Sequence, residues 1–218
     1  MLTLFKRRVA EYPKELLDIP INEACYAVID TELTGLDPKR DSIVSIGAIK
    51  MSGMRIKLGE AFYRLVKPQT ALTSDSVVVH GITPSEVEEK PYIGGVIPEL
   101  MNFCKECVLV GHFIHLDLMF LNREIKRFSG QSLDNPAVDT YRIHDWVKHH
   151  NGDFSRQYGD NGEKDLFSLA KKYKIQVSGA HNALMDAFIT AQLFQRFLSR
   201  LPQLGVRTVR DLLIIGRP

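Results

Sequence analysis

An α/β fold is predicted by the order in which strand-like and helix-like segments follow one another along the chain. Three strand-like segments come first, at residues 26–33, 42–51 and 55–68, and the short turns between them favour an antiparallel meander. Short apolar runs at 108–111 and 137–140 then alternate with segments of helical periodicity. With 218 residues, 44% of them hydrophobic, the chain can bury one core, so we expect a single domain.

The predicted helices rest on apolar residues spaced three and four apart and on capping residues at their ends. They lie at residues 84–90, 94–105, 116–128, 141–149, 165–173, 182–200 and 208–215. Residues 150–164 are rich in glycine, asparagine and charge, which indicates an exposed loop. Residues 3–17 show loose helical spacing before a break at Pro20. We therefore expect an N-terminal helical segment at residues 1–20 and one domain at residues 21–218.

Charge and hydropathy narrow the class of protein only slightly. A net charge of +2 and a pI near 8.4 neither demand nor exclude a nucleic-acid partner. The first 20 residues lack the apolar run of a secretory signal, and no stretch approaches the roughly 18 apolar residues of a membrane span. We therefore expect a soluble, cytoplasmic protein without a membrane partner.

The three cysteines, Cys25, Cys104 and Cys107, fit a reduced compartment better than a disulfide framework. Cys104 and Cys107 form a CxxC pair, but no second ligand pair at suitable spacing completes a structural zinc site. We expect two partly buried thiols at a helix-to-strand junction. A redox role for the pair remains an alternative.

Two acids end the first predicted strand. Side chains alternate between the faces of a strand, so Asp30 and Glu32 point the same way. Two like charges that close are unfavourable unless a proton or a cation lies between them, which makes the pair a candidate divalent-metal site. The alternative is two solvated acids at the end of an edge strand. The apolar run from Ala27 to Ile29 favours a buried strand instead.

Further acids follow later apolar runs. Asp117 falls in the first turn of the helix after the strand at 108–111, where an acid can also serve only as a helix cap. His181 and Asp186 are five residues apart, which places them roughly 140° apart on one helix. They can approach a common site only if His181 lies on the loop before the helix and Asp186 points inward from its second turn.

The combination and order of these residues resemble the three exonuclease motifs of the DEDDh family. The matching residues are Asp30, Thr31, Glu32, Thr34 and Gly35, then Gly111, His112, Asp117, Phe120 and Leu121, then His181, Asp186 and Ala187. A further match runs from His80 to Thr83. The family includes the proofreading epsilon subunit of bacterial replicative DNA polymerase, ribonuclease T and oligoribonuclease. The resemblance spans residues 25–198.

The resemblance implies a ribonuclease H-like fold, a five-stranded mixed sheet flanked by helices. It also implies a 3′–5′ exonuclease that releases nucleoside 5′-monophosphates from single-stranded DNA in proofreading or repair. Association with a DNA polymerase is a further expectation from the resemblance. Two divalent cations, Mg²⁺ or Mn²⁺, would be held by Asp30, Glu32, Asp117 and Asp186. His181 would be the general base. The substrate strand would be bound by Thr31, Leu33, Thr34, Gly35, His80, His112 and Phe113.

Three positions depart from the family pattern. Phe113 stands where many relatives have Asn, Leu116 where they have Phe, and Leu33 where Thr is frequent. The four acids and the histidine are intact, so we expect the chemistry to survive while the substrate strand is held differently near Phe113. His115 also lies close to Asp117, but the family pattern favours His181 as the base.

Two other functions stay open from the sequence. One is an exoribonuclease that acts on RNA ends or short oligonucleotides, because tolerance of the 2′-hydroxyl is a local property. The other is an inactive nucleic-acid-binding or docking module. Loss of a motif acid would favour that module, and none is lost.

Overall fold

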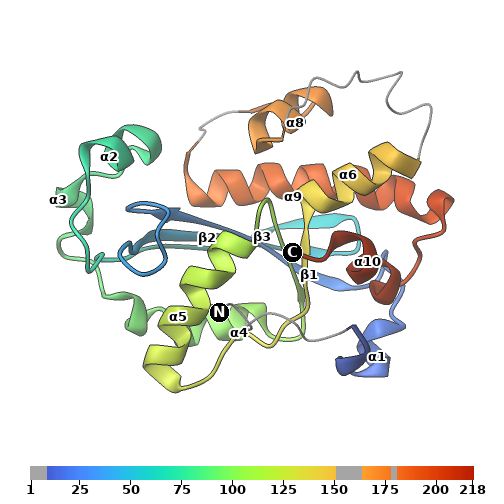
Figure 1. Ribbon diagram of the computed structural model, residues 1–218, viewed down its shortest axis with the longest axis horizontal. Helices are drawn as coiled ribbons and strands as arrows, with labels where there is room; N and C mark the ends of the chain where they lie inside the picture. The colour runs from blue at the N-terminus through green and yellow to red at the C-terminus, as the bar shows by residue number, and fades with distance from the viewer. Residues whose placement is uncertain (1–8, 151–163, 178–180) are drawn as a thin grey trace.

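A five-stranded mixed sheet forms the centre of the protein (Figure 1). The structure is a computed structural model that describes residues 9–150, 164–177 and 181–218. The strands are β1 (Cys25–Leu33), β2 (Ile43–Ser52), β3 (Arg55–Leu65), β4 (Val108–Gly111) and β5 (Ala137–Asp139). Their order is β3-β2-β1-β4-β5. The first three strands pair antiparallel, whereas β4 pairs parallel with β1 and β5, so the predicted meander and mixed sheet are confirmed.

Strand β1 is the central strand and carries the first acidic motif. It pairs with β2 on one side and β4 on the other. Residues from Tyr26 to Ile29 are at most 1% exposed, because helices cover both faces of the sheet here. The pairing register with β2 shifts between Glu32 and Leu33, which marks an irregularity where the strand ends. Asp30 and Glu32 therefore do not lie on an edge strand.

Helices cover the two faces of the sheet in separate layers (Figure 1). The helices α6 (Thr140–His150), α8 (Leu166–Lys172), α9 (Ala183–Arg200) and α10 (Val209–Gly216) share one hydrophobic core with the sheet. The helices α4 (Ile97–Cys104) and α5 (His115–Ser129) share a second core on the opposite face. The helices predicted for these segments are confirmed, with ends that differ by at most three residues.

A glycine lets α9 approach the sheet at the point where β1 carries its acids. Gly47 on β2 is paired with Asp30 on β1. A Cβ atom at Gly47 would lie 2.2 Å from backbone atoms of Ala183 and Leu184 at the start of α9. Only a glycine fits this approach, because real Cβ atoms do not come so near to backbone. The first turns of α9 are thereby held beside Asp30 and Glu32.

The remaining helices are short. They are η1 (Val9–Glu11), α1 (Lys14–Leu17), α2 (Ser74–His80), α3 (Pro84–Val87), η2 (Ile93–Gly95) and η3 (Leu201–Leu204). The helix predicted over residues 3–17 is thus two separate turns in its described part, because Pro13 interrupts the chain. Sequence periodicity did not predict α2, although Thr73 and Ser76 form a capping box there. Most of the loop expected at 150–164 lies outside the described residues.

None of the helices within the described ranges is both long and apolar enough to cross a lipid bilayer.

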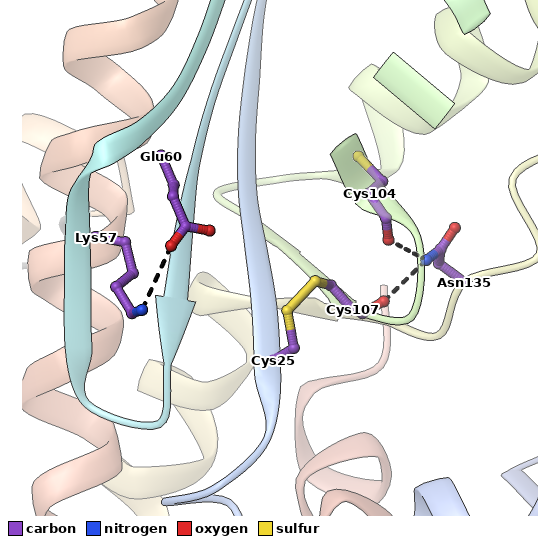
Figure 2. The surroundings of a disulfide bond; sticks show 6 residues. All are labelled: Cys25, Lys57, Glu60, Cys104, Cys107 and Asn135. Carbon is purple, nitrogen blue, oxygen red and sulfur yellow. Dashed lines mark hydrogen bonds and ion pairs between the residues drawn. A yellow bond between two sulfur atoms is a disulfide. The ribbon is translucent and has the colours of Figure 1, made fainter. Parts of the chain in front are cut away.

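Two of the cysteines form a disulfide, which corrects the expectation of free thiols (Figure 2). Cys25 begins β1, and Cys107 immediately precedes β4. Tyr26 and Val108, the next residues, are register partners, so the parallel pairing places the two cysteines side by side despite 82 residues between them. Cys104 stays a buried free thiol. The CxxC pair is therefore not a bonded pair.

An asparagine holds the turn that leads from α4 to Cys107. The side-chain Nδ2 of Asn135 donates hydrogen bonds to the backbone oxygens of Cys104 and Cys107, at 2.9 Å each (Figure 2). Glu106, within this turn, has a φ of +61°, a backbone conformation that residues other than glycine seldom adopt. The two hydrogen bonds and the disulfide together fix this tight turn before β4.

Candidate active site

Three acids from β1 and α9 meet at one point. Each of Asp30, Glu32 and Asp186 offers a carboxylate oxygen that lies within 4.8 Å of those of the other two. Asp30 and Glu32 share one face of β1, and Asp186 points inward from the first turns of α9, as the spacing predicted. We call these three residues the acid cluster.

Two oxygens of the acid cluster are buried without a partner. Neither Glu32 Oε1 nor Asp186 Oδ1 has a hydrogen-bond partner among the described residues. A buried carboxylate oxygen without a donor is costly, and a bound cation removes that cost. The donor set consists of oxygens alone, which suits hard cations such as Mg²⁺ and Mn²⁺ better than soft metals. The residues present therefore fit divalent cations.

The acids also raise one another's pKa values. Burial raises the pKa of Glu32 to about 7, and the charges of Asp186 and Asp117 add to this. Burial likewise raises the pKa of Asp186 to about 6 and holds that of Asp30 well above its usual range. For Asp30, the charges of three neighbouring acids act in the same direction. A positive charge at this point would stabilise the ionised forms.

Asp117 lies beside the acid cluster, on the first turn of α5. Its Oδ1 accepts a hydrogen bond of 2.6 Å from Thr31 Oγ1, the residue between the two acids of β1. Burial raises the pKa of Asp117 to about 7, and the hydrogen bond from Thr31 opposes this rise. The charge of Asp117 also raises the pKa of Asp30. Asp117, the fourth predicted ligand, therefore lies near the acid cluster without being one of its three residues, and it is hydrogen-bonded to Thr31.

His181 lies on the chain just before α9, as expected. It precedes the N-cap residue Asn182, is exposed and has a φ of +63°. Its backbone N–H donates to Asp186, and its ring lies with its edge against Phe167, with the ring centroids 5.0 Å apart. Asn182 Nδ2 donates to Tyr63 Oη at 3.3 Å, which ties this segment to β3. The imidazole therefore stands in solvent beside the acid cluster.

Three residues predicted to bind substrate lie where β1 ends: Leu33 is its last residue, and Thr34 and Gly35 follow it. Thr34 Oγ1 donates to Asp41 and accepts the backbone N–H of Ser42. A Cβ atom at Gly35 would lie 2.4 Å from Asp41 Oδ2, so a larger residue would displace the carboxylate that accepts from Thr34. Leu33 packs partly buried against the core beside α5. Thr34 and Gly35 therefore have a structural reason to be present that is independent of substrate.

The other residues predicted to bind substrate lie at the end of α2 and just after β4. His80 ends α2, is 7% exposed, and its Nδ1 accepts the backbone N–H of Ile82. Its Nε2 is buried without a partner among the described residues, and burial lowers its pKa. His112 Nε2 lies 2.7 Å from the backbone oxygen of Lys164, and Phe113 beside it is exposed.

A fifth buried acid, Asp139, was missed by the sequence reasoning. It ends β5, where its Oδ1 accepts backbone N–H groups from Phe113 and Tyr141. Burial raises its pKa, and its charge contributes to the raised pKa of Asp117. The signal that could have found it is the one used for Asp30, an acid directly after a short apolar strand.

Comparison with curated proteins relates this chain to DNA polymerase III. The PolC-type DNA polymerase III of Thermotoga maritima is 31% identical over 195 residues, which cover 89% of this chain and 13% of that protein. DNA polymerase III subunit epsilon of Aquifex aeolicus is 28% identical over 180 residues, or 82% of this chain and 83% of that protein. The chain spans about an eighth of the length of the PolC-type relatives.

Solved structures of exonucleases share the fold. Escherichia coli exonuclease I in complex with single-stranded DNA aligns with a TM-score of 0.73 and 20% identity, over 84% of this chain and 42% of that one. Exonuclease X in complex with 5′ overhanging duplex DNA gives 0.64 and 23%, over 88% of this chain and 99% of that one. The expected ribonuclease H-like fold is confirmed.

A family model matches most of the chain. The model, RNase_T, is described as an exonuclease and matches residues 27–194. This range holds Asp117, His181 and all three residues of the acid cluster. The chain therefore belongs to the RNase_T exonuclease family.

Proposed function

We propose that this chain is a metal-dependent 3′–5′ exonuclease that releases nucleoside 5′-monophosphates from the 3′ end of single-stranded DNA. The observation that supports it most is the acid cluster, with its two unpartnered carboxylate oxygens beside an exposed histidine. The exonuclease family and the relatives named as DNA polymerase III subunits support the direction and the substrate.

The proposed metal ligands are Asp30, Glu32, Asp117 and Asp186. Two divalent cations held there would stabilise the negative charge that develops on the phosphate and would favour ionisation of the attacking water. The four acids would hold the cations in fixed positions, because β1, α5 and α9 hold the acids in a fixed arrangement. Burial also excludes bulk water, which strengthens each electrostatic contact with the substrate.

The proposed general base is His181. An imidazole nitrogen of His181 would accept the proton of the attacking water, and histidine is the side chain that most often serves as a general base. Its backbone N–H donates to Asp186, which keeps His181 next to the acid cluster. Asn182 and Tyr63 hold the backbone of this segment. An exposed ring leaves room for a substrate phosphate to enter between His181 and the acids.

The test is mononucleotide release from a 3′-tailed single strand of DNA, with Mg²⁺, Mn²⁺ or EDTA. We expect activity with either cation, none with EDTA, and at least a thousandfold loss in Asp186→Asn. Glu106→Gln is the matched control, because it also removes one negative charge but lies on an exposed turn at the opposite end of β4. Full activity of Asp186→Asn would contradict the proposed metal site.

Matched RNA strands in the same assay distinguish DNA from RNA as the preferred substrate. A higher kcat/KM on DNA supports the proposal, and a higher value on RNA or short oligonucleotides would replace it with an exoribonuclease. Association with a polymerase belongs to the same proposal, because curated relatives are DNA polymerase III proteins. Co-elution of the chain with a replicative polymerase catalytic subunit in gel filtration would support that association.

A further inference from the structure

Three aromatic rings gather where β4 and β5 end. Gly111 on β4 is the register partner of Asp139 on β5, and the chain continues from both in the same direction. The residues two positions further on, Phe113 and Tyr141, therefore lie side by side, with ring centroids 5.0 Å apart. The ring of His112 lies 4.7 Å from that of Phe113 and 6.4 Å from that of Tyr141. We call these three residues the aromatic cluster.

Phe113 is both exposed and held in an unfavourable backbone conformation. It is 43% exposed, although burial would stabilise a side chain of this size. Its φ is +54°, a region that asparagine and glycine enter readily and aromatic residues seldom do. Because 43% of Phe113 is exposed and its backbone conformation is unfavourable, core packing alone does not explain a phenylalanine here. Such an exception points to a use of the ring outside the fold.

The surroundings hold the aromatic cluster rigidly. The backbone N–H of Phe113 donates to Asp139, as does that of Tyr141, so one carboxylate fixes both aromatic residues. The ring of His112 is fixed on both sides, by Thr140 Oγ1 at 2.9 Å and by the backbone oxygen of Lys164 at 2.7 Å. A surface that is ordered before binding loses little entropy when a flat ligand stacks on it.

The aromatic cluster is adjacent to the acids. Asp139, which fixes Phe113 and Tyr141, is close enough to Asp117 to raise its pKa. Asp117 in turn is bound to Thr31, between the two acids of β1. Two positively charged residues are neighbours of the cluster and are exposed: Arg142 follows Tyr141, and the backbone oxygen of Lys164 contacts His112. Aromatic rings beside cations are the usual surface for single-stranded nucleic acid.

We propose that the exposed ring of Phe113, supported by Tyr141, is a stacking subsite for a nucleobase of the strand being degraded. This inference rests on the proposed function. Stacking accepts every base, since each has a flat π surface, so the subsite would add affinity without sequence preference.

The test compares KM and kcat on a single-stranded DNA oligonucleotide for wild type, Phe113→Ala, Phe113→Asn and Phe113→Trp. For Ala and Asn we expect KM to rise about 5- to 100-fold with a smaller change in kcat. Phe113→Trp should keep KM near the wild-type value, because tryptophan also stacks. The Asn variant fits the left-handed backbone, so it should fold at least as stably as wild type.

Phe128→Ala is the matched control. Phe128 is 54% exposed on α5, eleven residues beyond Asp117, or about 16 Å along the helix. Its KM should equal that of wild type. A second readout is the fluorescence of 2-aminopurine in the oligonucleotide, which stacking quenches. We expect quenching on binding to Asp186→Asn protein, which does not degrade the strand, and loss of that quenching when Phe113→Ala is added.

The outcomes separate this inference from the proposed function. An inactive wild type would contradict the exonuclease proposal itself. An active wild type whose KM and 2-aminopurine quenching are unchanged in Phe113→Ala and Phe113→Asn would overturn the stacking subsite and leave the exonuclease intact. A KM that rises equally in Phe113→Trp would also overturn it, because the effect would then come from the shape of the loop.

Discussion

The two ends of the paired strands β1 and β4 differ in their interactions. Buried like charges meet at the carboxyl ends, and a disulfide joins the amino ends. At their carboxyl ends, Asp30 and Glu32 of β1 lie near Asp117, which follows β4, and buried like charges raise one another's pKa values. At their amino ends, the disulfide between Cys25 and Cys107 joins the same two strands (Figure 2). Five residues of β1, roughly 17 Å, separate Cys25 from Asp30.

The difference shows where this fold carries its unfavourable interactions. The carboxylates of the acid cluster repel one another, and the proposed cations would remove that repulsion, so that end of the strand pair loses stability in the free protein. The opposite end has no such charges and is closed covalently. Changes at the carboxyl ends should therefore alter activity and pH dependence, whereas changes at the amino ends should alter stability alone.

The largest expected effect is on activity, from His181→Asn. Asparagine tolerates the left-handed backbone at this position, so folding should be unaffected, but it cannot accept the proton of the attacking water. We expect kcat to fall about 10²- to 10⁴-fold with the affinity for Mg²⁺ largely kept. Steady-state kinetics and a Mg²⁺ titration check this.

His149→Asn is the control for that variant, since His149 is an exposed histidine on α6. It should keep wild-type kcat. Equal activity of His181→Asn and wild type would remove His181 from the mechanism, and attention would turn to His115.

The second effect is on stability, from opening the disulfide. The bond closes a loop of 82 residues in the unfolded chain, so its loss should lower the free energy of unfolding by about 2–4 kcal/mol. Urea denaturation with and without dithiothreitol measures this, and the double variant Cys25→Ser/Cys107→Ser should not respond to the reductant. The kcat of the reduced protein should stay unchanged at a temperature where it is folded. A fall in kcat would show that the two ends are coupled.

The third effect is a gain in stability from Glu32→Gln in EDTA. The pKa of Glu32 is about 7 in the folded protein and about 4.5 when unfolded, so its ionised form destabilises the fold. That destabilisation develops as pH rises from 4.5 to 7 and is complete above pH 7. We expect the variant to be about 2 kcal/mol more stable than wild type at pH 8 and equal to it at pH 4.5.

Mg²⁺ should reduce or reverse this difference in stability between wild type and Glu32→Gln. Wild type gains free energy of binding from the cation and the variant gains less, so the difference at pH 8 should shrink or change sign. The comparison of two variants at each pH cancels other titrating groups, such as the buried His144, whose pKa is lowered to about 4. A variant less stable than wild type in EDTA at pH 8 would show that the ionised Glu32 does not destabilise the fold.

Local sequence signals predicted the strands, the longer helices and the loop position of His181. The apolar runs just before Asp30 and at residues 108–111 are short and buried. The alternation of side chains along a strand is enough to place Asp30 and Glu32 on one face. Asp186 could be placed beside them only through the resemblance to the three exonuclease motifs, because no local pattern joins residue 186 to residue 30. The strand and helix predictions, in contrast, need only residues close together in sequence.

Two of the features that were missed depend on how distant strands pair, and a third is a helix without apolar periodicity. The disulfide requires Tyr26 to be aligned with Val108, and no local pattern in the chain contains that register. The neighbouring positions of Phe113 and Tyr141 likewise depend on the pairing of Gly111 with Asp139. The helix α2 was missed because it has no apolar periodicity, with Val78 and Val79 exposed, and is specified mainly by its cap.

The smallest effect tests how finely the acidic end is tuned, through Thr31→Val. The hydroxyl of Thr31 donates to Asp117 at 2.6 Å and opposes the rise in its pKa, so valine should let a proton compete better with the cation. We expect the Mg²⁺ concentration for half-maximal activity to rise about 3- to 10-fold, with kcat at saturating Mg²⁺ nearly unchanged. A Mg²⁺ titration of the nuclease rate measures this shift.

Thr190→Val provides the matched comparison within the same fold. Thr190 is fully buried on α9, and its hydroxyl has no hydrogen-bond partner among the described residues. Removing that hydroxyl should leave the Mg²⁺ requirement unchanged and the stability equal or slightly higher, because no hydrogen bond is lost. If both variants shift the Mg²⁺ titration equally, the effect comes from core packing rather than from the bond to Asp117. A shift in Thr31→Val alone would show that one hydroxyl on the central strand adjusts the affinity of the acids for their cation.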